Sequence, residues 1–281
     1  MVIGFIGAGR TGCTLGKYLG GHITVAGYYS RTRQSADDAA TFTQSRAFYD
    51  LETLVNNCDT IFITTPDRVI SEVWECIRNY NIKDKIVCHF SGSLSSGIFS
   101  GIGVTGAFCC SVHPMYAFSN KYTSYLQFNT ACLSVEGQET AVQEIKGLFC
   151  GLGHKVFTIN PCDKTKYHAA AAFASNYVTA AMHIAIQLLK ECGFNENDAR
   201  KLLAPVSLGN INSVLADGTV QALTGPVERG DISTIKKHLD VLGDENIIKI
   251  YKELGSVLVS IAEEKNPDRD YTELRNCLEG C

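Results

Sequence analysis

The sequence has little net charge and no block of like charges. Across 281 residues, 25 lysines and arginines stand against 29 aspartates and glutamates, which leaves a formal net charge of −4. Nucleic acids and anionic membrane surfaces are bound through clustered positive charge and the release of counterions. We therefore expect no nucleic acid and no membrane among the partners, and we expect a small-molecule substrate instead.

The sequence also lacks the cysteine spacing of a metal site or a disulfide framework. Its 12 cysteines are spread from Cys13 to Cys281 without a CxxC pair, and no group of His, Cys and Asp has the spacing of metal ligands. A chain of this length does not need disulfides to hold a core. We predict reduced thiols that behave as small apolar residues, and no metal.

Targeting and membrane-spanning segments are missing from the sequence pattern as well. The first apolar run lacks the basic region that precedes the core of a secretory signal, and we expect no apolar stretch long enough to span a bilayer. Apolar residues make up 45% of the chain and charged residues 19%, which is typical of globular proteins. We predict a cytoplasmic protein with one large domain or two ordinary ones.

Apolar runs that alternate with helical patterns fill the first half of the chain. They predict an α/β fold of the Rossmann type, with a doubly wound, mainly parallel sheet that helices cover on both faces. After Pro161 every segment is predicted to be helical, beginning with an Ala-rich helix over residues 164–192. We predict a Rossmann domain over residues 1–160 and an all-helical domain over 161–281. The expected strands are residues 2–6, 23–29, 60–64, 85–90, 107–112, 130–135 and 155–159.

A glycine motif, GxGxxG, follows the first expected strand and opens the first expected helix. Gly7 permits the tight turn, Gly9 lets a pyrophosphate approach the backbone, and Gly12 lets the helix pack closely on the strand. The free N–H groups at the helix N-terminus would face the phosphates. We predict a dinucleotide site, whose first residues are Gly7, Ala8, Gly9, Arg10, Thr11 and Gly12.

The second expected strand lacks the carboxylate that usually follows it in NAD-binding chains. It is followed instead by Ser30, Arg31, Thr32 and Arg33. Guanidinium groups can bind the oxygens of a 2′-phosphate bidentately, which a carboxylate would repel. The alternative is that both arginines are solvated loop charges. We predict NADP rather than NAD as cofactor.

Three further strand ends carry candidate residues, because ligands of open parallel sheets lie beyond the carboxyl ends of the strands. Small residues near Thr65-Pro66-Asp67 and Ser91-Gly92 would let the nicotinamide half of the cofactor approach. Both segments are also ordinary turn chemistry. His113 would face the crevice or would cap backbone groups.

The Ala-rich helix carries a polar stripe. If the helix is α-helical throughout, Lys164, His168 and Ser175 project within about 40° of one another, and Asn176 lies about 80° from His168. Buried polar groups need partners, so the stripe favours a ligand-binding face. The alternative is a tightly packed core or dimer helix.

These residues suggest roles in proton exchange with a substrate. His168 is the preferred acid or base and His113 the second candidate, since hydride transfer requires a proton at the substrate heteroatom. Lys164 or Lys166 would orient the substrate or stabilise negative charge. Asn176, together with Ser91, would position the substrate.

A resemblance to a known group rests on GFIGAGRTG at 4–12, HFSGSLSS at 89–96, VHP at 112–114, YHAAAAFASNY at 167–177 and LTGPVERGD at 223–231. The chain resembles Rossmann-type oxidoreductases that carry a C-terminal helical domain of unknown function, within the wider 6-phosphogluconate dehydrogenase-like superfamily. Pyrroline-5-carboxylate reductase and ketopantoate reductase are more distant relatives. The resemblance implies NADP-dependent redox chemistry and a homodimer formed through the helical half, and it supplies no substrate. The Lys-and-Asn pairing of hydroxyacid dehydrogenases in the superfamily has no match on this helix.

The last of these motifs contains two polar residues with separate expectations. Asp231 is expected to be the N-cap of a helix over residues 232–242. Arg229 lies between two glycine-flanked turns and is a candidate for binding a carboxylate in the cleft, from its own or a neighbouring subunit.

Together these observations predict an NADP-dependent oxidoreductase that acts on a small carbonyl, imine or hydroxyacid substrate. A non-catalytic NADP-binding sensor or interaction protein is the alternative, because a fold does not establish a function. Transfer between NADP and another redox carrier, such as a deazaflavin, is a third reading. The first two differ in whether Lys164, His168 and Asn176 face the nicotinamide end of the cleft.

Overall fold

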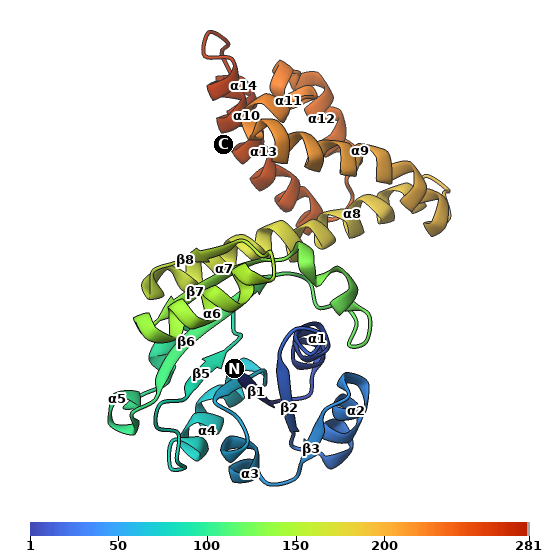
Figure 1. The fold of residues 1–281 in the computed structure, drawn as a ribbon. Coiled ribbons are helices and arrows are strands. Elements are labelled where there is room, and N and C mark those ends of the chain that lie inside the picture. The colour runs from blue at the N-terminus through green and yellow to red at the C-terminus, as the bar shows by residue number, and fades with distance from the viewer. Residues whose placement is uncertain (280–281) are drawn as a thin grey trace. The chain divides into compact units, whose positions relative to one another are not determined.

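The computed structural model describes residues 1–279 and divides into two compact units (Figure 1). The first, here called the sheet unit, ends at Tyr177. The second, the helical unit, begins at Val178. Each unit is described by itself.

The sheet unit contains one sheet of eight strands in the order β3-β2-β1-β4-β5-β6-β7-β8. Its first six strands are parallel and follow the 3-2-1-4-5-6 order of doubly wound dinucleotide-binding folds. Strand β7 is antiparallel to β6, and β8 is parallel to β7. The predicted fold class is confirmed. The strands are β1 (Val2–Ile6), β2 (Thr24–Tyr29), β3 (Arg46–Phe48), β4 (Thr60–Ile63), β5 (Ile86–His89), β6 (Phe108–Met115), β7 (Cys132–Gly137) and β8 (Val156–Thr158).

Two strands differ from the sequence-based expectation. Strand β3 was not predicted, because it has three residues and pairs on one side only. Strand β6 continues past Val112 to Met115 and includes Pro114. Pro114 pairs with Leu133, whose N–H donates to Lys155 O on the far side of β7, so no ladder bond to β6 is required there.

Helices cover both faces of the sheet, as predicted. On one face α1, α2 and α6 pack against Phe5, Phe62 and Val112. On the other face α3 and α4 pack around Trp74, the single tryptophan, which is fully buried. The elements between the strands are α1 (Arg10–Leu19), α2 (Arg33–Thr43), α3 (Leu51–Asn56), α4 (Asp67–Ile77), η1 (Ser96–Ile98), α5 (Ile102–Thr105), η2 (Ser124–Thr130) and α6 (Glu139–Gly151), and η3 (Pro161–Asp163) follows the last strand.

The long helix predicted over residues 164–192 changes its winding in the middle. It consists of α7 (Lys164–Ala172), the π-helical segment η4 (Phe173–Tyr177) and α8 (Val178–Glu191). A π-helix places more residues in each turn than an α-helix does. The predicted angles of Ser175 and Asn176 assume an α-helix throughout, so they do not hold.

The two units divide at the end of this π-helical segment. Strands give way to helices earlier, after β8, which is where the predicted boundary between residues 160 and 161 lies. Helix α7 therefore belongs to the sheet unit by its packing, although its secondary structure matches that of the helical unit. The boundary at residue 160 stays a prediction.

The helical run Pro161–Glu191 is long and apolar enough to cross a membrane by length and composition, with 31 residues and a mean hydropathy of 1.3 in its most apolar window. The expectation that no apolar stretch reaches this length was wrong, because alanine and aliphatic residues outweigh the few charges of that window. None of that window is buried inside the structure, and a single helix that meets these criteria is weak evidence for a membrane span.

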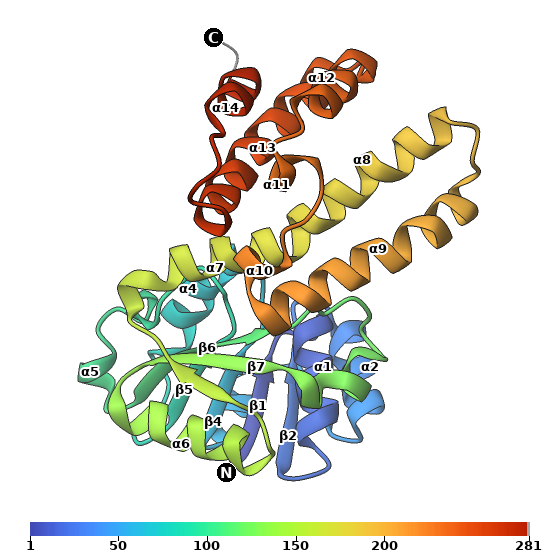
Figure 2. The same ribbon diagram turned by 90° about the horizontal axis from the view of Figure 1, so that it is seen from above.

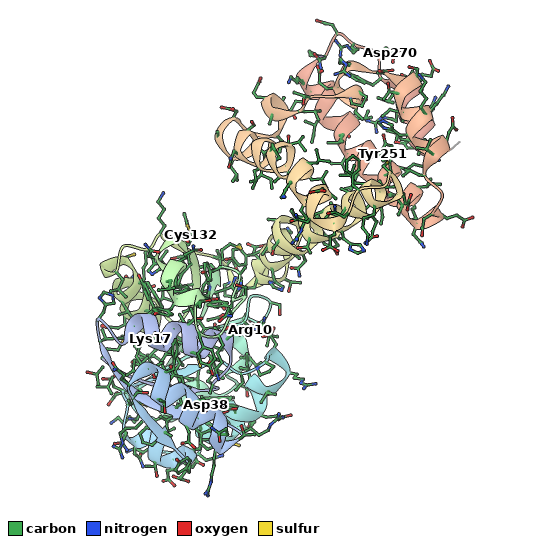
Figure 3. All side chains as sticks on the ribbon, turned by 90° about the vertical axis from the view of Figure 1, so that its right-hand side faces the viewer. Arg10, Lys17, Asp38, Cys132, Tyr251 and Asp270 are labelled. Carbon is green, nitrogen blue, oxygen red and sulfur yellow. The ribbon has the colours of Figure 1, made fainter. Side chains whose placement is uncertain are left out.

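The helical unit has a small core of its own, formed by α11 to α14 around Val227, Ile235 and Leu274. Helices α8 and α9 form an antiparallel pair (Figure 2). On α13, the hydroxyl of Tyr251 (Figure 3) lies 2.8 Å from His238 Nδ1 of α12. The remaining helices are α9 (Glu196–Asp217), α10 (Thr219–Ala222), α11 (Pro226–Arg229), α12 (Ile232–Val241), α13 (Glu245–Lys265) and α14 (Thr272–Glu279).

Asp231 caps α12 as predicted. Its carboxylate accepts hydrogen bonds from the backbone N–H and the hydroxyl of Thr234, and these bonds lower the pKa of Asp231 to about 2. The preceding residues, predicted as a turn, contain the one-turn helix α11.

Candidate functional site

The glycine turn brings β1, β4 and α1 into close contact. Gly7 has a φ of 111°, and a Cβ there would lie 2.8 Å from the carbonyl carbon of Thr64. A Cβ at Gly12 would overlap Gly7 O and would lie 2.6 Å from Thr64 Oγ1. The Thr64 hydroxyl donates to Gly7 O at 2.8 Å. Side chains at Gly7 and Gly12 would therefore force the helix away from the sheet.

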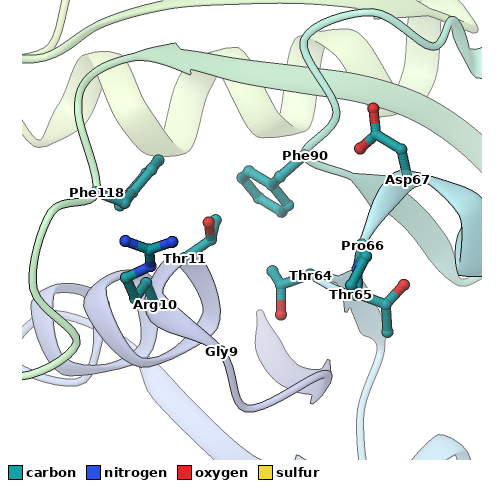
Figure 4. Close-up of a pocket in the computed structure, with 9 residues that line it drawn as sticks. All are labelled: Gly9, Arg10, Thr11, Thr64, Thr65, Pro66, Asp67, Phe90 and Phe118. Carbon is teal, nitrogen blue, oxygen red and sulfur yellow. The ribbon is translucent and has the colours of Figure 1, made fainter.

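A cavity of about 390 Å³ opens beside this turn. A Cβ at Gly9 would meet no atom within 4 Å, so the backbone there borders open space. Gly9 also caps α1 without a side chain, and the first N–H groups of the helix have no intrahelical acceptor. Figure 4 shows the lining residues, which are Gly9, Arg10, Thr11, Thr64, Thr65, Pro66, Asp67, Phe90 and Phe118.

The cavity lies at the switch point of the sheet. Strands β1 and β4 are neighbours, yet the helices that follow them, α1 and α4, pack on opposite faces. The crevice between such diverging connections is where doubly wound sheets bind their ligands.

The glycine side of the cavity is positively charged. Arg10 stands at the start of α1 (Figure 3) and donates from Nη1 to Ser119 O at 3.5 Å. Its guanidinium and the N-terminal end of the helix dipole both favour an anion. The rings of Phe90 and Phe118 supply apolar surface to the cavity, and Phe118 lies beside Arg10 (Figure 4).

The predicted phosphate-binding residues after β2 lie outside the cavity lining, next to it in the sheet order. Ser30 is half-buried and Arg31 is exposed. The Arg33 guanidinium lies 5.2 Å from the centre of the Tyr49 ring, in a cation–π contact. No carboxylate directly follows the strand, as the sequence shows.

Asp67 links the segment after β4 to the loop after β5. It begins α4, and its Oδ2 accepts hydrogen bonds from Ser91 Oγ at 2.7 Å and Ser93 Oγ at 3.0 Å. Ser91 Oγ in turn accepts from the backbone N–H groups of Ser93 and Leu94. The loop after β5 is thereby fixed against the start of α4.

Lys164 is buried in the sheet unit rather than exposed on a ligand-binding face. Its side chain is 1% exposed, and Nζ donates to Ser91 O at 2.9 Å and to Ser111 Oγ. Burial lowers the pKa of Lys164 to about 8, while the negative charges of Glu136 and Asp67 act in the opposite direction. The ammonium therefore supports the β5 and β6 strand ends from within the protein.

Three of the predicted residues meet at the carboxyl ends of β5 and β6. The ring centroids of His113 and His168 lie 5.8 Å apart, with the rings nearly perpendicular. A Cβ at Gly92 would lie 2.5 Å from His168 Nδ1 and 2.8 Å from His113 Nε2. Only glycine at position 92 leaves room for both rings.

His113 is neutral at pH 7 in this environment. Burial lowers its pKa to about 4, and the charges of Lys164 and His168 act in the same direction. The Tyr167 hydroxyl lies 3.2 Å from His113 Nδ1 and thereby fixes the ring.

Sequence reasoning did not single out His89 or Glu136 as residues of this region. His89 is fully buried, its Nε2 lies 3.1 Å from Ser95 O, its Nδ1 accepts from Ser91 N–H, and burial lowers its pKa to about 4. Buried Glu136 accepts from the N–H and hydroxyl of Ser96. Position 89 begins the HFSGSLSS motif and gave a usable signal, whereas Glu136 lies 40 residues from its partner and gave none.

Three candidates remain, two in the sheet unit and one in the helical unit. Lys166 and Asn176 are exposed. Arg229 is exposed at the end of α11, within the helical unit. Their proposed roles stay predictions.

Solved structures share this fold over nearly the whole chain. A protein provisionally described as an NADP oxidoreductase, from Bacteroides fragilis, is 22% identical with a TM-score of 0.77, over 92% of this chain and 98% of its own. A protein from Thermotoga maritima is 24% identical with a TM-score of 0.74, over 94% and 99%. Pyrroline carboxylate reductase from Plasmodium falciparum, solved with NADP bound, is 14% identical with a TM-score of 0.61, over 99% and 98%.

No curated protein matches the chain. Two family models match it in succession: a Rossmann-like domain over residues 1–114 and a domain of unknown function, DUF2520, over residues 131–257. The resemblance to a Rossmann-type chain with a C-terminal helical domain of unknown function is thereby confirmed. The chain combines a Rossmann-like domain with a DUF2520 domain.

Proposed function

We propose that the protein is an NADP-dependent oxidoreductase acting on a small carbonyl, imine or hydroxyacid substrate. One observation carries the proposal: a cavity at the switch point of the sheet, bordered by a glycine turn whose helix N-terminus is open to it. This arrangement suits the pyrophosphate of a dinucleotide. The names of the Bacteroides and Plasmodium neighbours, which mention NADP, support it.

The lining of the cavity fits such a cofactor. Arg10 and the first N–H groups of α1 would hold the pyrophosphate, and the absence of a Cβ at Gly9 leaves the space that it needs. Thr65 lines the cavity, and its Oγ1 is buried without a hydrogen-bond partner within residues 1–279. Pro66, together with Ser91 and Gly92, would border the nicotinamide end. The bound nicotinamide would supply a hydride to a substrate carbon or accept one from it.

The choice of NADP over NAD rests on Arg31 and Arg33. Both follow β2, the strand whose end contacts the adenosine ribose in doubly wound folds. Two guanidinium groups there would bind a 2′-phosphate, and the contact of Arg33 with the Tyr49 ring holds one of them at the strand end.

His168 and His113 would exchange the proton with the substrate. His168 is exposed beside Gly92 and can present a ring nitrogen to a substrate heteroatom. Neutral His113, fixed by Tyr167, would accept or relay the proton as the second member. Lys164 acts through the strand ends, because its ammonium is bonded to Ser91 and Ser111.

A screen for NADPH oxidation tests this function, with keto acids, imines and aldehydes as candidate substrates. We expect at least one class to be reduced. The variant His168→Gln should bind NADPH with unchanged affinity and lose most of its turnover, whereas unchanged turnover would remove His168 from the mechanism. Silence across the whole panel, with NADPH bound, would favour the sensor alternative.

We infer in addition that two copies associate through the helical half. Helix α8 contains no buried residue and helix α9 contains one, Ala199. Both helices carry exposed apolar side chains on much of their surface. Apolar surface of this extent is typical of an interface. Sedimentation of the purified protein should give twice the mass of the chain, and a monomer at micromolar concentration would contradict the inference. The exposed apolar side chains are Val178, Leu202, Val206, Leu208, Ile211 and Leu215.

A further inference from the structure

We propose that the Asp67 carboxylate is the counter-ion of a positively charged substrate nitrogen, so that the substrate belongs to the iminium class and the product is an amine. The inference rests on the proposed function and narrows its three substrate classes to one. It concerns the far side of the cavity, away from the glycine turn.

Asp67 is held in place but is not neutralised. It lines the cavity, it is exposed, and the hydroxyls of Ser91 and Ser93 both donate to its Oδ2. Its Oδ1 accepts no hydrogen bond from the described residues, and Asp67 takes part in no ion pair among them. Arg10 lies on the opposite side of the cavity in Figure 4. One carboxylate oxygen is thus available to a ligand.

The groups around Asp67 do not cancel its charge toward the cavity. His113 and His89 are neutral at pH 7, because burial lowers both pKa values to about 4. The Lys164 ammonium is buried and donates to Ser91 O and Ser111 Oγ, and the negative charges of both Glu136 and Asp67 act on it. With two carboxylates against one ammonium, the formal charge at this end is negative.

A carboxylate beside the substrate stabilises some of the three substrate classes and destabilises others. Reduction of a carbonyl builds negative charge on oxygen, which a neighbouring carboxylate destabilises, and a hydroxyacid brings a carboxylate of its own. Reduction of an iminium starts from a positive nitrogen, which the carboxylate attracts. The charge of Asp67 thus opposes two classes and favours the third.

The reaction balances without a further reagent. An iminium and NADPH give an amine and NADP⁺: the transferred hydride forms the new C–H bond, the C=N π pair becomes the nitrogen lone pair, and the positive charge passes from the nitrogen to the nicotinamide ring.

Binding of two inert probes tests the inference without turnover. Cyclohexylamine, which is a cation at pH 7, and cyclohexanol, its neutral analogue, are titrated by calorimetry into the complex of the full chain with NADPH. Neither probe can react, since probe and cofactor are both reduced. We expect cyclohexylamine to bind at least tenfold more tightly than cyclohexanol.

Two variants of matched charge separate the role of Asp67 from a general effect. Asp67→Asn keeps an oxygen for the serine hydroxyls and removes the charge, so the preference for the amine should fall about tenfold while cyclohexanol binding is unchanged. Asp84→Asn removes the same charge at the amino end of β5, at a φ of 60° that asparagine tolerates, and should keep the preference.

Each outcome has a distinct meaning. Equal binding of cyclohexylamine and cyclohexanol, or a preference for cyclohexylamine that survives Asp67→Asn, overturns the assignment of Asp67. If NADPH still binds in that experiment, the proposed function is unaffected. Failure of NADPH itself to bind in the same cell would reject the proposed function, and the substrate assignment with it.

Discussion

Replacement of the buried lysine, Lys164→Met, should change how the stability of the sheet unit depends on pH. The folded pKa near 8 lies below the ordinary 10.5, so the unfolded chain binds the proton more tightly than the folded chain does. Folding is then opposed by the charge below pH 8, and stability rises with pH until the unfolded lysine also loses its proton. The full effect is about 3 kcal/mol, and about 2 to 3 kcal/mol of it falls between pH 7 and pH 10.

Urea unfolding followed by tryptophan fluorescence measures this effect in the right part of the molecule. Trp74 is the single tryptophan and is buried in the sheet unit that holds Lys164. The quantity compared is the free energy of unfolding of the natural protein minus that of Lys164→Met, at pH 7 and at pH 10. The subtraction removes the titration of other groups.

We expect this difference to shift in favour of the natural protein by about 2 to 3 kcal/mol as the pH rises. At any one pH its sign is not fixed, since methionine relieves the buried charge and also leaves Ser91 O and Ser111 Oγ without their donor. Lys166→Met, on the same helix but exposed, is the control and should show no such shift. A pH-independent difference for Lys164→Met would refute the burial of its ammonium.

Three glycine substitutions in the site test further parts of the account. Gly12→Ala should unfold the sheet unit at lower urea concentration, because the new Cβ overlaps Gly7 O, whereas Gly9→Ala should leave the unfolding midpoint nearly unchanged and weaken NADPH binding by about tenfold or more, as a calorimetric titration would reveal. Equal loss of stability in both variants would contradict this division of roles. Gly92→Ala should keep NADPH binding within about threefold and reduce turnover of any substrate found in the screen, because its Cβ displaces His168 and His113; full activity would show that the two rings need not meet.

The fold followed from local patterns in the sequence. Alternating apolar runs and helical patterns predicted the doubly wound sheet, and the glycine motif marked the start of α1. Strand β3 escaped prediction because three residues give no usable periodicity. The π-helical segment at Phe173–Tyr177 escaped because an Ala-rich sequence gives no sign of where its winding changes.

The sequence named several residues of the candidate site but did not predict how they are arranged. His168, His113 and Gly92 were named from strand ends and from a helix stripe, and they do meet. The burial of Lys164 could not be foreseen, because its acceptors on Ser91 and Ser111 lie 73 and 53 residues away. The link between Asp67 and Ser91 depends in the same way on the order of β4 and β5 in the sheet.

The central claim is that the glycine turn and the two arginines after β2 bind a phosphorylated dinucleotide. Calorimetric titration of the purified chain with NADPH and with NADH tests it most directly, with an Arg31→Ala and Arg33→Ala double variant alongside. We expect NADPH to bind at least tenfold more tightly than NADH, and the double variant to lose that preference while still binding NADH. Binding of neither nucleotide, or tighter binding of NADH by the natural protein, would contradict the account.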